Sequence, residues 1–395
     1  MTNFIHSTEE QGAAYVTAIM DMDRLRVTKK RIAAGDTSFN PALAALRNEA
    51  DQWCDKKPAS VMDKTLAPPG GDKHDYLSFG TYWWPDPSTK DGLPFIRRDG
   101  ERYPESIGPK SDCPCLEKMA AGAETLALAW YFTGDEKYAT QSASYITTWF
   151  LDPAARMNPH LEYGQAIPGR CEGRGIGLID TRHFLLVINA LALLEGSSAL
   201  SPAQRQELHA WFKAYLQWMR ESSHGRDESG EHNNHGTWYD VQVAHFAFFT
   251  GAHDVTRAMV ESAIKTRLDT QVAADGSQPR ELARTRSFSY SLMNLGGFLA
   301  LSELGKKTGV DFWSHSPTGG TTGLILAAID YMAAYADSHK PWTYQQIVPL
   351  NRGDLFPFLR QARVFTGDAR YDEFCQKLPQ RALQAHRANL LWPVP

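Results

Sequence analysis

The stretch "YFTGDEKYATQ", Tyr131–Gln141, has the pattern of a sharp connection between two helices. Apolar residues lead to a glycine, an aspartate follows it directly, and a second amphipathic segment begins. Glycine suits the left-handed residue that ends a helix, and an acidic residue suits the N-cap of the next helix. The pattern recurs in "FFTGAHDVTRA", Phe248–Ala258, and in "VFTGDARYDEF", Val364–Phe374. We therefore expect helical hairpins packed side by side, in an α-helical toroid or solenoid.

Helical periodicity extends through most of the chain outside these turns. Ser201 and Pro202 form a clear helix start, with Ser as the N-cap and Pro at the first helical position. Alternating strand patterns are scarce, and no convincing linker divides the chain, so we expect one all-α domain over residues 1–395. Apolar residues recur at spacings of three and four in residues 115–134, 181–196, 201–222, 237–251, 255–271, 288–305 and 321–338.

Two long connections interrupt the helical pattern. Residues 56–114 and 152–179 are rich in proline and glycine and carry many polar and aromatic side chains. Connections of this length in a compact domain are usually functional. The expected architecture is therefore an (α/α) toroid, an incomplete barrel of helical hairpins, whose long loops form a cleft on one face.

The composition is that of a globular protein, with 43% hydrophobic and 22% charged residues among 395. A net charge of −4 and the lack of a long basic run argue against nucleic-acid binding. We see no apolar run as long as a membrane span, so no membrane association is expected. The first residues, "MTNFIHSTEEQGAAYVTAIMDMDRLR", show no basic segment followed by an apolar stretch, and no signal peptide is visible.

The cysteine count is odd, which argues against a full disulfide framework. "CPC" has one spacer residue, whereas redox and zinc motifs have two. We interpret the cysteines as structural or incidental thiols with one bridge at most. They are Cys54, Cys113, Cys115, Cys171 and Cys375.

The stretch "GEHNNHGTWYD", residues 230–240, combines polar and aromatic residues just before a long apolar run. One interpretation is a metal site. His232 and His235 are three residues apart and would share a helical face, and His245 or His253 would be the third ligand. The HExxH spacing is missing, so the sequence favours a site without metal, and no cofactor is expected.

Two other interpretations of this stretch need no metal. The amide of Asn234 and the imidazole of His235 could bind a substrate carboxylate side by side. Alternatively, the residues could only cap the following helix, because asparagine is a good N-cap. Tyr239, which follows shortly, is a candidate for substrate binding.

A second cluster is "DGSQPRELARTRSFSYSLMNL", residues 275–295. Arg286 and Tyr290 lie one helical turn apart, with Arg284 just upstream. A positive charge beside a phenol favours its ionised form, so such a tyrosine could act as a base or an acid. The alternative is a solvated basic helix face.

Two further clusters lie in the long loops. In "YLSFGTYWWPDP", residues 76–87, Trp83 and Trp84 could form a sugar-stacking platform or anchor the loop in the core. The second loop, "NPHLEYGQAIPGRCEGRGIGLIDTRH", has neither Walker spacing nor a preceding strand, so we interpret its polar residues as cleft lining. These candidates are His160, Tyr163, Gln165, Arg174 and His183.

Taken together, "YWWPDP", "NNHGTWYD" and "ELARTRSFSY", in this order, resemble the alginate lyase superfamily of polysaccharide lyases. The closest resemblance is to polysaccharide lyase family 38, which includes alginate and β-1,4-glucuronan lyases. It covers roughly residues 76–290, with weaker similarity on either side. The resemblance implies an (α/α) toroid, an anionic polysaccharide substrate and a periplasmic or secreted location.

The resemblance also implies catalytic roles. An Asn-His pair neutralises the uronate carboxylate, which falls on Asn234 and His235, and a tyrosine transfers the proton, which falls on Tyr290. An arginine assists. Alignment on "ELAR" selects Arg284, whereas helix geometry selects Arg286, and the spacing of Arg284 from Tyr290 departs by one residue from that of better-known alginate lyases.

The implied reaction is β-elimination across a 1,4 linkage between uronic acids, which leaves a 4,5-unsaturated uronate. In mannuronate and glucuronate, H5 and O4 lie on one face, so Tyr290 could take the proton and return it. In guluronate they lie on opposite faces, and a second base, His183 or His160, is needed. Alginate and glucuronan both remain possible substrates.

Two alternatives remain. A glycoside hydrolase would need two carboxylates flanking the bond, and Asp180, Glu172 and Asp240 are available without forming an obvious pair. A non-catalytic sugar-binding protein of helical repeats would need none of these groups. Formation of an unsaturated uronate distinguishes the lyase from both.

Overall fold

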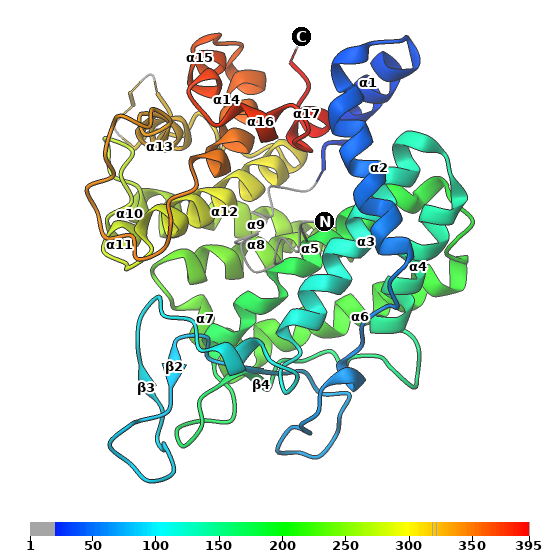
Figure 1. Cartoon of the computed structure of the whole chain (residues 1–395), viewed down its shortest axis with the longest axis vertical. Coiled ribbons are helices and arrows are strands. Elements are labelled where there is room, and N and C mark those ends of the chain that lie inside the picture. The colour runs from blue at the N-terminus through cyan, green and yellow to red at the C-terminus, as the bar shows by residue number, and fades with distance from the viewer. Residues whose placement is uncertain (1–19, 318, 321, 395) are drawn as a thin grey trace, which may run out of the picture.

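A computed structural model of the chain describes residues 20–394 except 318 and 321, so the segment inspected for a leader lies largely outside the described residues. The described part is mostly helical, as expected (Figure 1). The first half contains α1 (Met22–Ala33), α2 (Asn40–Cys54), α3 (Cys113–Thr133), α4 (Glu136–Phe150), α5 (Phe184–Leu193), α6 (Pro202–Glu221), α7 (Ser223–Ser229) and α8 (Asn234–Phe249). The second half contains α9 (His253–Ala263), α10 (Asp269–Gln271), α11 (Pro279–Leu282), α12 (Ser287–Thr308), α13 (Leu324–Ala333), α14 (Phe356–Thr366), α15 (Arg370–Gln376), α16 (Gln380–Leu383) and α17 (Ala388–Leu391).

Two of the three expected hairpin turns form as the sequence predicts. Gly134 ends α3 with φ +73°, and the carboxylate of Asp135 accepts the backbone N–H of Lys137 at the start of α4. Gly367 ends α14 in the same left-handed conformation, and Asp368 accepts the N–H of Arg370. The third turn differs. Gly251 is left-handed, but Ala252 occupies the N-cap of α9, so the expected acidic cap is missing there.

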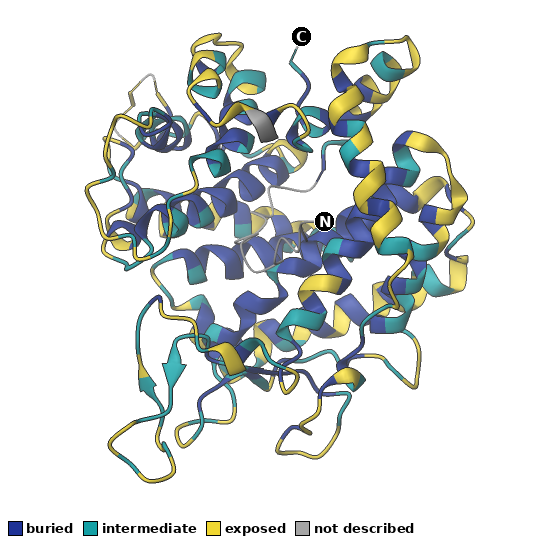
Figure 2. Cartoon of the chain, viewed as in Figure 1, coloured by how far each residue is buried: buried dark blue, intermediate teal, exposed yellow. Residues whose placement is uncertain are grey.

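The helices form a curved ring, with the most buried helices on its inner side (Figure 2). α3, α5, α8 and α12 bury most of their residues, whereas α1 and α2 show an exposed outer face. The ends of the described chain meet. α17 packs against α1 and α2, and Arg387 forms an ion pair of 2.9 Å with Glu49 of α2. One cluster of buried hydrophobic side chains extends from Met20 to Trp392, in keeping with the expected single domain.

The long loops carry the strands, which are few and short. β1 (Leu77–Phe79) pairs in parallel with β4 (Tyr163–Ala166), so the two long loops are joined to each other. β2 (Trp83–Trp84) and β3 (Ile96–Arg97) form an antiparallel hairpin that projects below the ring (Figure 1). This arrangement places the aromatic loop at one edge of the helical ring.

One helical stretch reaches the length and hydropathy of a membrane span, contrary to the sequence-based expectation. It is Gly175–Gly196, in which a 3-10 segment, Gly175–His183, leads into α5. Most of this stretch is buried inside the protein. Its apolar character is explained by its place at the centre of the ring, where it is covered on all sides.

Candidate active site

The start of α12 and the β2–β3 hairpin meet at a pair of tyrosines. The hydroxyl of Tyr290, in the first turn of α12, donates a hydrogen bond of 2.7 Å to the hydroxyl of Tyr82. The guanidinium of Arg284 lies over the ring of Tyr290, 4.0 Å from its centroid. Arg286 lies nearer to Tyr82, 5.8 Å from that ring. The sequence did not decide which of these two arginines assists the reaction. In the structure they contact different tyrosines.

Both arginines are held by the turn that follows β3. Asp99 accepts hydrogen bonds from Arg284 at 2.8 and 3.2 Å and from the hydroxyl of Thr285 at 3.0 Å. Burial acts to raise the pKa of Asp99, but the hydrogen bonds and charge of Arg284 bring that pKa down to about 2. Arg286 donates to the backbone carbonyl of Gly100 at 2.7 Å. Arg284 is thus a fixed cation directly beside Tyr290.

The ionisation of Tyr290 differs from the expectation. We expected the neighbouring arginine to lower the pKa of this phenol. Instead, burial raises the pKa of Tyr290 well above its usual value, the Tyr82 hydroxyl raises it further, and Arg284 opposes this only in part. The surroundings of Tyr290 therefore favour the neutral phenol over the phenolate.

His235, in the first turn of α8, is paired with a buried acid that the sequence did not single out. Its Nδ1 lies 2.8 Å from Oε1 of Glu228, at the end of α7. The side chain of Glu228 is 1% exposed and that of His235 is 15% exposed. Burial raises the pKa of Glu228, and the nearby imidazole works in the opposite direction. The pair orients the ring and leaves Nε2 without a hydrogen bond to any described residue.

Asn234 does not lie where we expected a residue that binds the substrate carboxylate. It is fully buried, and its side-chain amide and backbone N–H donate to the two oxygens of Glu281 at 2.8 and 2.7 Å. Asn233, one residue earlier, is the N-cap of α8 and accepts the N–H of His235 at 2.9 Å. Asn233 is therefore the capping residue. Asn234, which precedes His235 directly, is held by Glu281.

Glu281 links this group to the tyrosine pair. Burial raises its pKa, while the hydrogen bonds from Asn234 and the charges of Arg284 and His235 act to lower it. The backbone N–H of Arg284 also donates to the carbonyl of Glu281 at 3.1 Å. Glu281 thus contacts Asn234 on one side and Arg284 on the other, and Arg284 contacts Tyr290.

A break in helical geometry positions the loop before α8. The expected helix over residues 255–271 is divided by a π-helical segment, Ile264–Leu268, and such segments often mark functional sites. It directs Arg267 inward, where it forms an ion pair of 2.8 Å with Asp240 and donates to the carbonyls of Ser229 and Glu231. A Cβ on Gly236 would lie 2.0 Å from the carbonyl oxygen of Glu231, so glycine is required for this close approach.

Trp83 and Trp84 have different roles. The guanidinium groups of Arg170 and Arg174 lie 5.1 and 5.8 Å from the ring centroid of Trp83. Trp84 instead donates its indole N–H to the carbonyl of Glu101 at 2.8 Å and contacts the ring of Tyr103. Trp84 thus anchors the loop, whereas Trp83 belongs to a group of polar and charged residues.

Gln165 and Arg174 are hydrogen-bonded to each other beside Trp83. Arg174 donates to the backbone carbonyl and the side-chain oxygen of Gln165, each at 3.0 Å. Burial lowers the pKa of Arg174, and acidic groups that include Glu228 partly offset this. Gln165 adopts φ +50°, a left-handed conformation that is uncommon for a residue with a side chain and often marks functional sites.

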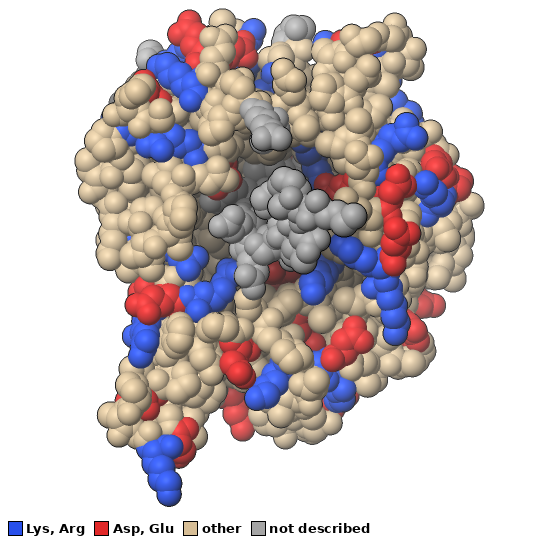
Figure 3. Space-filling model, viewed as in Figure 1, with Lys and Arg blue, Asp and Glu red and all other residues tan. Residues whose placement is uncertain are grey.

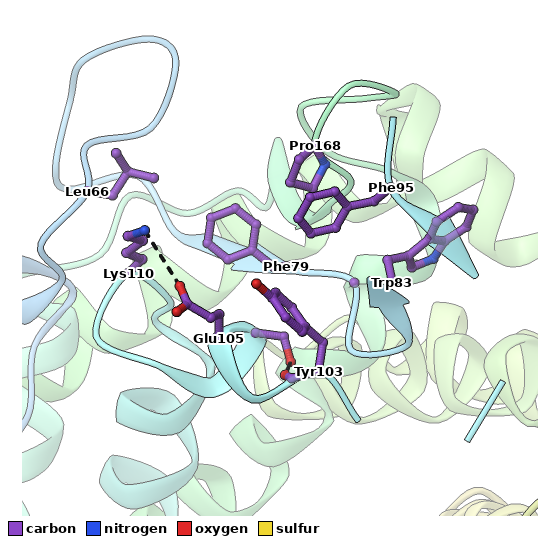
Figure 4. Close-up of a pocket in the computed structure, with 10 residues that line it drawn as sticks. Leu66, Phe79, Trp83, Phe95, Tyr103, Glu105, Lys110 and Pro168 are labelled. Atoms are coloured by element: carbon purple, nitrogen blue, oxygen red, sulfur yellow. Dashed lines mark hydrogen bonds and ion pairs between the residues drawn. The ribbon is translucent and has the colours of Figure 1, made fainter. Parts of the chain in front are cut away.

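Trp83 also borders a pocket of about 260 Å³ (Figure 4). Phe79, Phe95 and Pro168 face its interior, with Tyr103 and an ion pair of 3.6 Å between Lys110 and Glu105 at one side. Leu66, Gly80 and Ser106 complete the lining. The pocket is mainly apolar and lies beside the tyrosine pair rather than at it, since Tyr82 and Trp83 are adjacent in the chain.

Four of the expected site residues lie away from the tyrosine pair. His183 is buried, and burial together with the charge of Arg182 holds its pKa well below the usual value. Tyr239 is buried in the core, donates to the carbonyl of Met219 at 3.2 Å, and has its pKa raised by burial to about 12. Both positions correct the expectation that these side chains line the cleft.

The other two lie among the long loops. His160 forms an ion pair of 2.9 Å with Asp75 and faces Trp218. Tyr163 lies in β4, and its hydroxyl reaches Gly70 closely enough to leave no room for a Cβ there. Neither residue contacts Tyr290 or His235 among the hydrogen bonds and ion pairs of the described residues.

The residues considered for a metal site or for hydrolysis do not come together among the described residues. Among the residues that the structure describes, no three His, Cys, Asp or Glu side chains gather as a metal ion would require. His232 precedes α8 and is exposed, whereas His245 is fully buried. The carboxylates considered for hydrolysis are also dispersed. Asp240 pairs with Arg267, and Asp180 accepts hydrogen bonds from Tyr76, Ser78 and Gln165.

The sequence did not assign Tyr82, Asp99, Glu228 or Glu281. Tyr82 stood within the aromatic stretch that we quoted, but nothing local distinguished it from Trp83. Each of these four residues meets its partner only through the tertiary fold. On the face that Figure 3 shows, both Lys or Arg and Asp or Glu side chains lie around the residues drawn in grey.

Comparisons with known proteins identify the family of the chain. A family model described as alginate lyase matches residues 60–342, which extends beyond the resemblance at both ends. The crystal structure of an alginate lyase from Bacteroides ovatus is 38% identical, covers 96% of this chain and 99% of its own, and superposes with a TM-score of 0.89.

Alginate lyase A1-III from Sphingomonas species A1 shares the fold, with 17% identity, coverage of 96% and 97%, and a TM-score of 0.60. A variant of that enzyme, complexed with tetrasaccharide, gives a TM-score of 0.58 at 16% identity, with coverage of 98% and 99%. No curated protein sequence matches the chain. The chain therefore belongs to the alginate lyase family, and it is a polysaccharide lyase built on a helical toroid.

Proposed function

We propose that this lyase cleaves 1,4-linked uronic acid polymers of the alginate type by β-elimination at the cluster of Tyr290, Tyr82, Arg284 and His235. The observation that carries the proposal is the hydrogen bond between the two tyrosine hydroxyls beside the fixed cation of Arg284. The family match and the tetrasaccharide complex of a structural relative support a polyuronate substrate. The assignment to polysaccharide lyase family 38 remains a prediction.

The first requirement of this reaction is to neutralise the carboxylate of the uronate, because H5 is otherwise too weakly acidic. His235 is suited to this. If buried Glu228 keeps its proton, its hydroxyl donates to Nδ1, and Nε2 carries the hydrogen that faces the substrate. If Glu228 is ionised, the imidazole must carry two protons to donate in the same way. In both states the pair presents one N–H to the carboxylate, and a preorganised donor of this kind is worth about 10²–10³ in rate.

The second requirement is proton transfer at C5 and O4. The phenolate of Tyr290 would take H5, the C4–O4 bond would break, and the same hydroxyl would return the proton to the leaving O4. Because burial raises the pKa of Tyr290 in the free enzyme, its proton must first pass to solvent before the phenolate can act as the base. The rate should therefore rise with pH until Tyr290 is ionised.

The stereochemistry points to a preference among linkages. Guluronate needs a second base on the opposite face, and the two histidines considered for that role are poorly placed. His183 is buried, and His160 pairs with Asp75. We therefore propose that mannuronate and glucuronate linkages are cleaved better than guluronate linkages. The contacts to C2 that separate mannuronate from glucuronate would come from the Trp83 side of the site.

The test is to incubate the enzyme separately with polymannuronate, polyguluronate and glucuronan. We expect ultraviolet absorbance from a 4,5-unsaturated uronate with polymannuronate or glucuronan, and little with polyguluronate. Chain shortening with new reducing ends but no unsaturated product would instead show hydrolysis. Binding without any shortening would show a non-catalytic protein.

We further propose that the enzyme acts in the periplasm or outside the cell, where polymeric substrates are met. Separation of the periplasmic, extracellular and cytoplasmic fractions of the native organism, followed by the same absorbance assay, tests this. Activity confined to the cytoplasmic fraction would contradict it.

A further inference from the structure

A second group of aromatic side chains lies on the surface near the start of α12, and the mechanism above does not use it. We call it the aromatic ledge, formed by Tyr331, Trp342 and Tyr344. Buried Tyr335, 8% exposed, packs against Tyr331 and Trp342. The Tyr331 and Tyr344 hydroxyls are 2.9 Å apart, and the rings of Trp342 and Tyr344 are 5.2 Å apart. Tyr344 is 38% exposed, and Ile347 beside it is 44% exposed. Large apolar groups gathered on a surface often mark a binding site.

The charges around the ledge are positive. Nζ of Lys340 lies 4.3 Å from the ring centroid of Tyr335, and Arg352 donates to the backbone carbonyls of Tyr335 and Lys340. Neither Lys340 nor Arg352 forms an ion pair with a carboxylate among the described residues. Two acids that are close to them in the sequence accept hydrogen bonds from other residues. Asp337 accepts the backbone N–H of His339, and Asp354 accepts the side-chain amide of Asn351.

The ledge is fixed to the catalytic segment by direct hydrogen bonds. The indole N–H of Trp342 donates to Oγ of Ser287 at 2.8 Å, and the N–H of Ser287 donates to the carbonyl of Gln345 at 3.2 Å. Ile347 donates its N–H to the carbonyl of Thr285 at 2.9 Å. Ser287 and Tyr290 lie in the same first turn of α12, so the ledge begins within about one helical pitch, ~5.4 Å along the axis, of the proposed proton-transfer residue.

We propose that the aromatic ledge is a second binding platform for anionic polysaccharide, which holds uronate units of the chain beyond those at the cleavage site. Aromatic rings offer a flat apolar surface to the C–H face of a sugar, and Lys340 and Arg352 offer charge to its carboxylates. This inference rests on the proposed function, because the same polymer must span both places. A chain too short to span them gains nothing from the ledge.

The test compares binding of long polymannuronate and mannuronate tetrasaccharide in a Tyr290→Phe background, which prevents cleavage. Tyr344→Ala and Lys340→Ala should each raise the Kd for the long polymer about threefold to tenfold, the size expected for one ring or charge contact. The Kd for the tetrasaccharide should stay unchanged. In the otherwise wild-type enzyme, KM for the long polymer should rise with kcat unchanged.

Two control variants sharpen the comparison. Tyr344→Phe keeps the ring and should bind the long polymer as the parent does. Phe365→Ala removes another exposed aromatic, 41% exposed with Lys306 5.8 Å from its ring centroid, which lies at the end of α14 and does not contact the catalytic segment. It should leave both Kd values unchanged.

Two results would overturn the proposal. Either the ledge variants bind the long polymer as tightly as the parent, or they weaken the tetrasaccharide equally, which would make the ledge part of the cleavage site. Failure of the proposed function has a separate signature. Wild-type enzyme would then form no unsaturated product from any polyuronate, while the binding comparison would still decide whether the ledge holds the polymer.

Discussion

The hydroxyl of Tyr290 donates a hydrogen bond of 2.7 Å to the hydroxyl of Tyr82, although 208 residues separate the two in the chain. Tyr290 begins a core helix, and Tyr82 directly precedes the short hairpin of the first long loop. The bond therefore joins the rigid ring to the loop that carries the aromatic residues. Together with burial, it also raises the pKa of Tyr290, the residue that we assign to proton transfer.

Replacement of Tyr290 by phenylalanine should lower kcat at least about 10³-fold, because it removes the hydroxyl that we assign to moving the proton between C5 and O4. The ring and its contact with Arg284 remain, so the melting temperature should stay close to that of the wild type. Initial rates of unsaturated uronate formation measure the effect. Retention of more than roughly a tenth of kcat would assign the base role to His235 instead.

Replacement of Tyr82 by phenylalanine should shift the pH dependence of kcat to lower pH. Burial raises the pKa of Tyr290, and the Tyr82 hydroxyl adds to this by accepting a hydrogen bond from the neutral phenol, so loss of that hydroxyl should lower the pKa. Because the phenolate is the active base, the rise of kcat with pH should then occur earlier. A profile that stays in place, or moves to higher pH, would show that Tyr82 does not control Tyr290.

Alanine substitution should separate the two arginines. Arg284 lies over the Tyr290 ring and is fixed by Asp99, so Arg284→Ala should reduce kcat about 10²–10³-fold, as loss of a preorganised charge does. Arg286 is nearer to Tyr82 and donates to a backbone carbonyl, so Arg286→Ala should have the smaller effect on kcat. Steady-state kinetics on polymannuronate provide the comparison, and the reverse order would select Arg286.

The two tryptophans should respond differently to alanine. Trp83 lies beside Arg174 and borders a pocket, so Trp83→Ala should raise KM about threefold to tenfold with a smaller change in kcat. Trp84 anchors its loop through Glu101 and Tyr103, so Trp84→Ala should instead lower the melting temperature. Kinetics and thermal unfolding of both variants are needed. Equal effects on KM would contradict the distinction.

Activity should survive exhaustive treatment with EDTA, since the roles that a metal would fill are given to His235 and Arg284. Short soluble oligosaccharides are the substrate of choice, because calcium gels the polymer and would obscure the result. Loss of activity on chelation, with recovery on adding zinc or calcium, would contradict the mechanism.

The helical part of the fold could be predicted because its signals are local. Gly134 and Asp135 define a hairpin turn by themselves, and Ser201 forms the expected cap with Gln204, whose side chain returns a hydrogen bond. The third turn was less well predicted, because Ala252 cannot cap a helix through its side chain. Turns and caps could therefore be predicted where the interacting residues lie within one helical turn of each other in the chain.

The site could be predicted only in part. The residue types at His235, Tyr290 and Arg284 carried a resemblance, but their partners Glu228, Tyr82 and Asp99 come from other elements. The direction of the Tyr290 pKa shift was wrong because burial outweighs the visible arginine, and burial is a property of the folded chain. Asn234 was expected to bind the substrate carboxylate because a sequence does not show on which side of the first turn a side chain falls.

The contact between α17 and the first helices lies at the opposite edge of the ring from the β2–β3 hairpin (Figure 1). Arg387 closes this contact through Glu49 and Glu124, and neither acid belongs to the substrate loops. The contacts that complete the ring are thus separate from those that hold the substrate loops. Exchange of the β2–β3 hairpin, residues 83–97, for the corresponding hairpin of another family member keeps Tyr82 and Asp99 in place. It should change which polymer is bound while leaving the joint that completes the ring intact, which makes this hairpin a natural module for transplanting specificity.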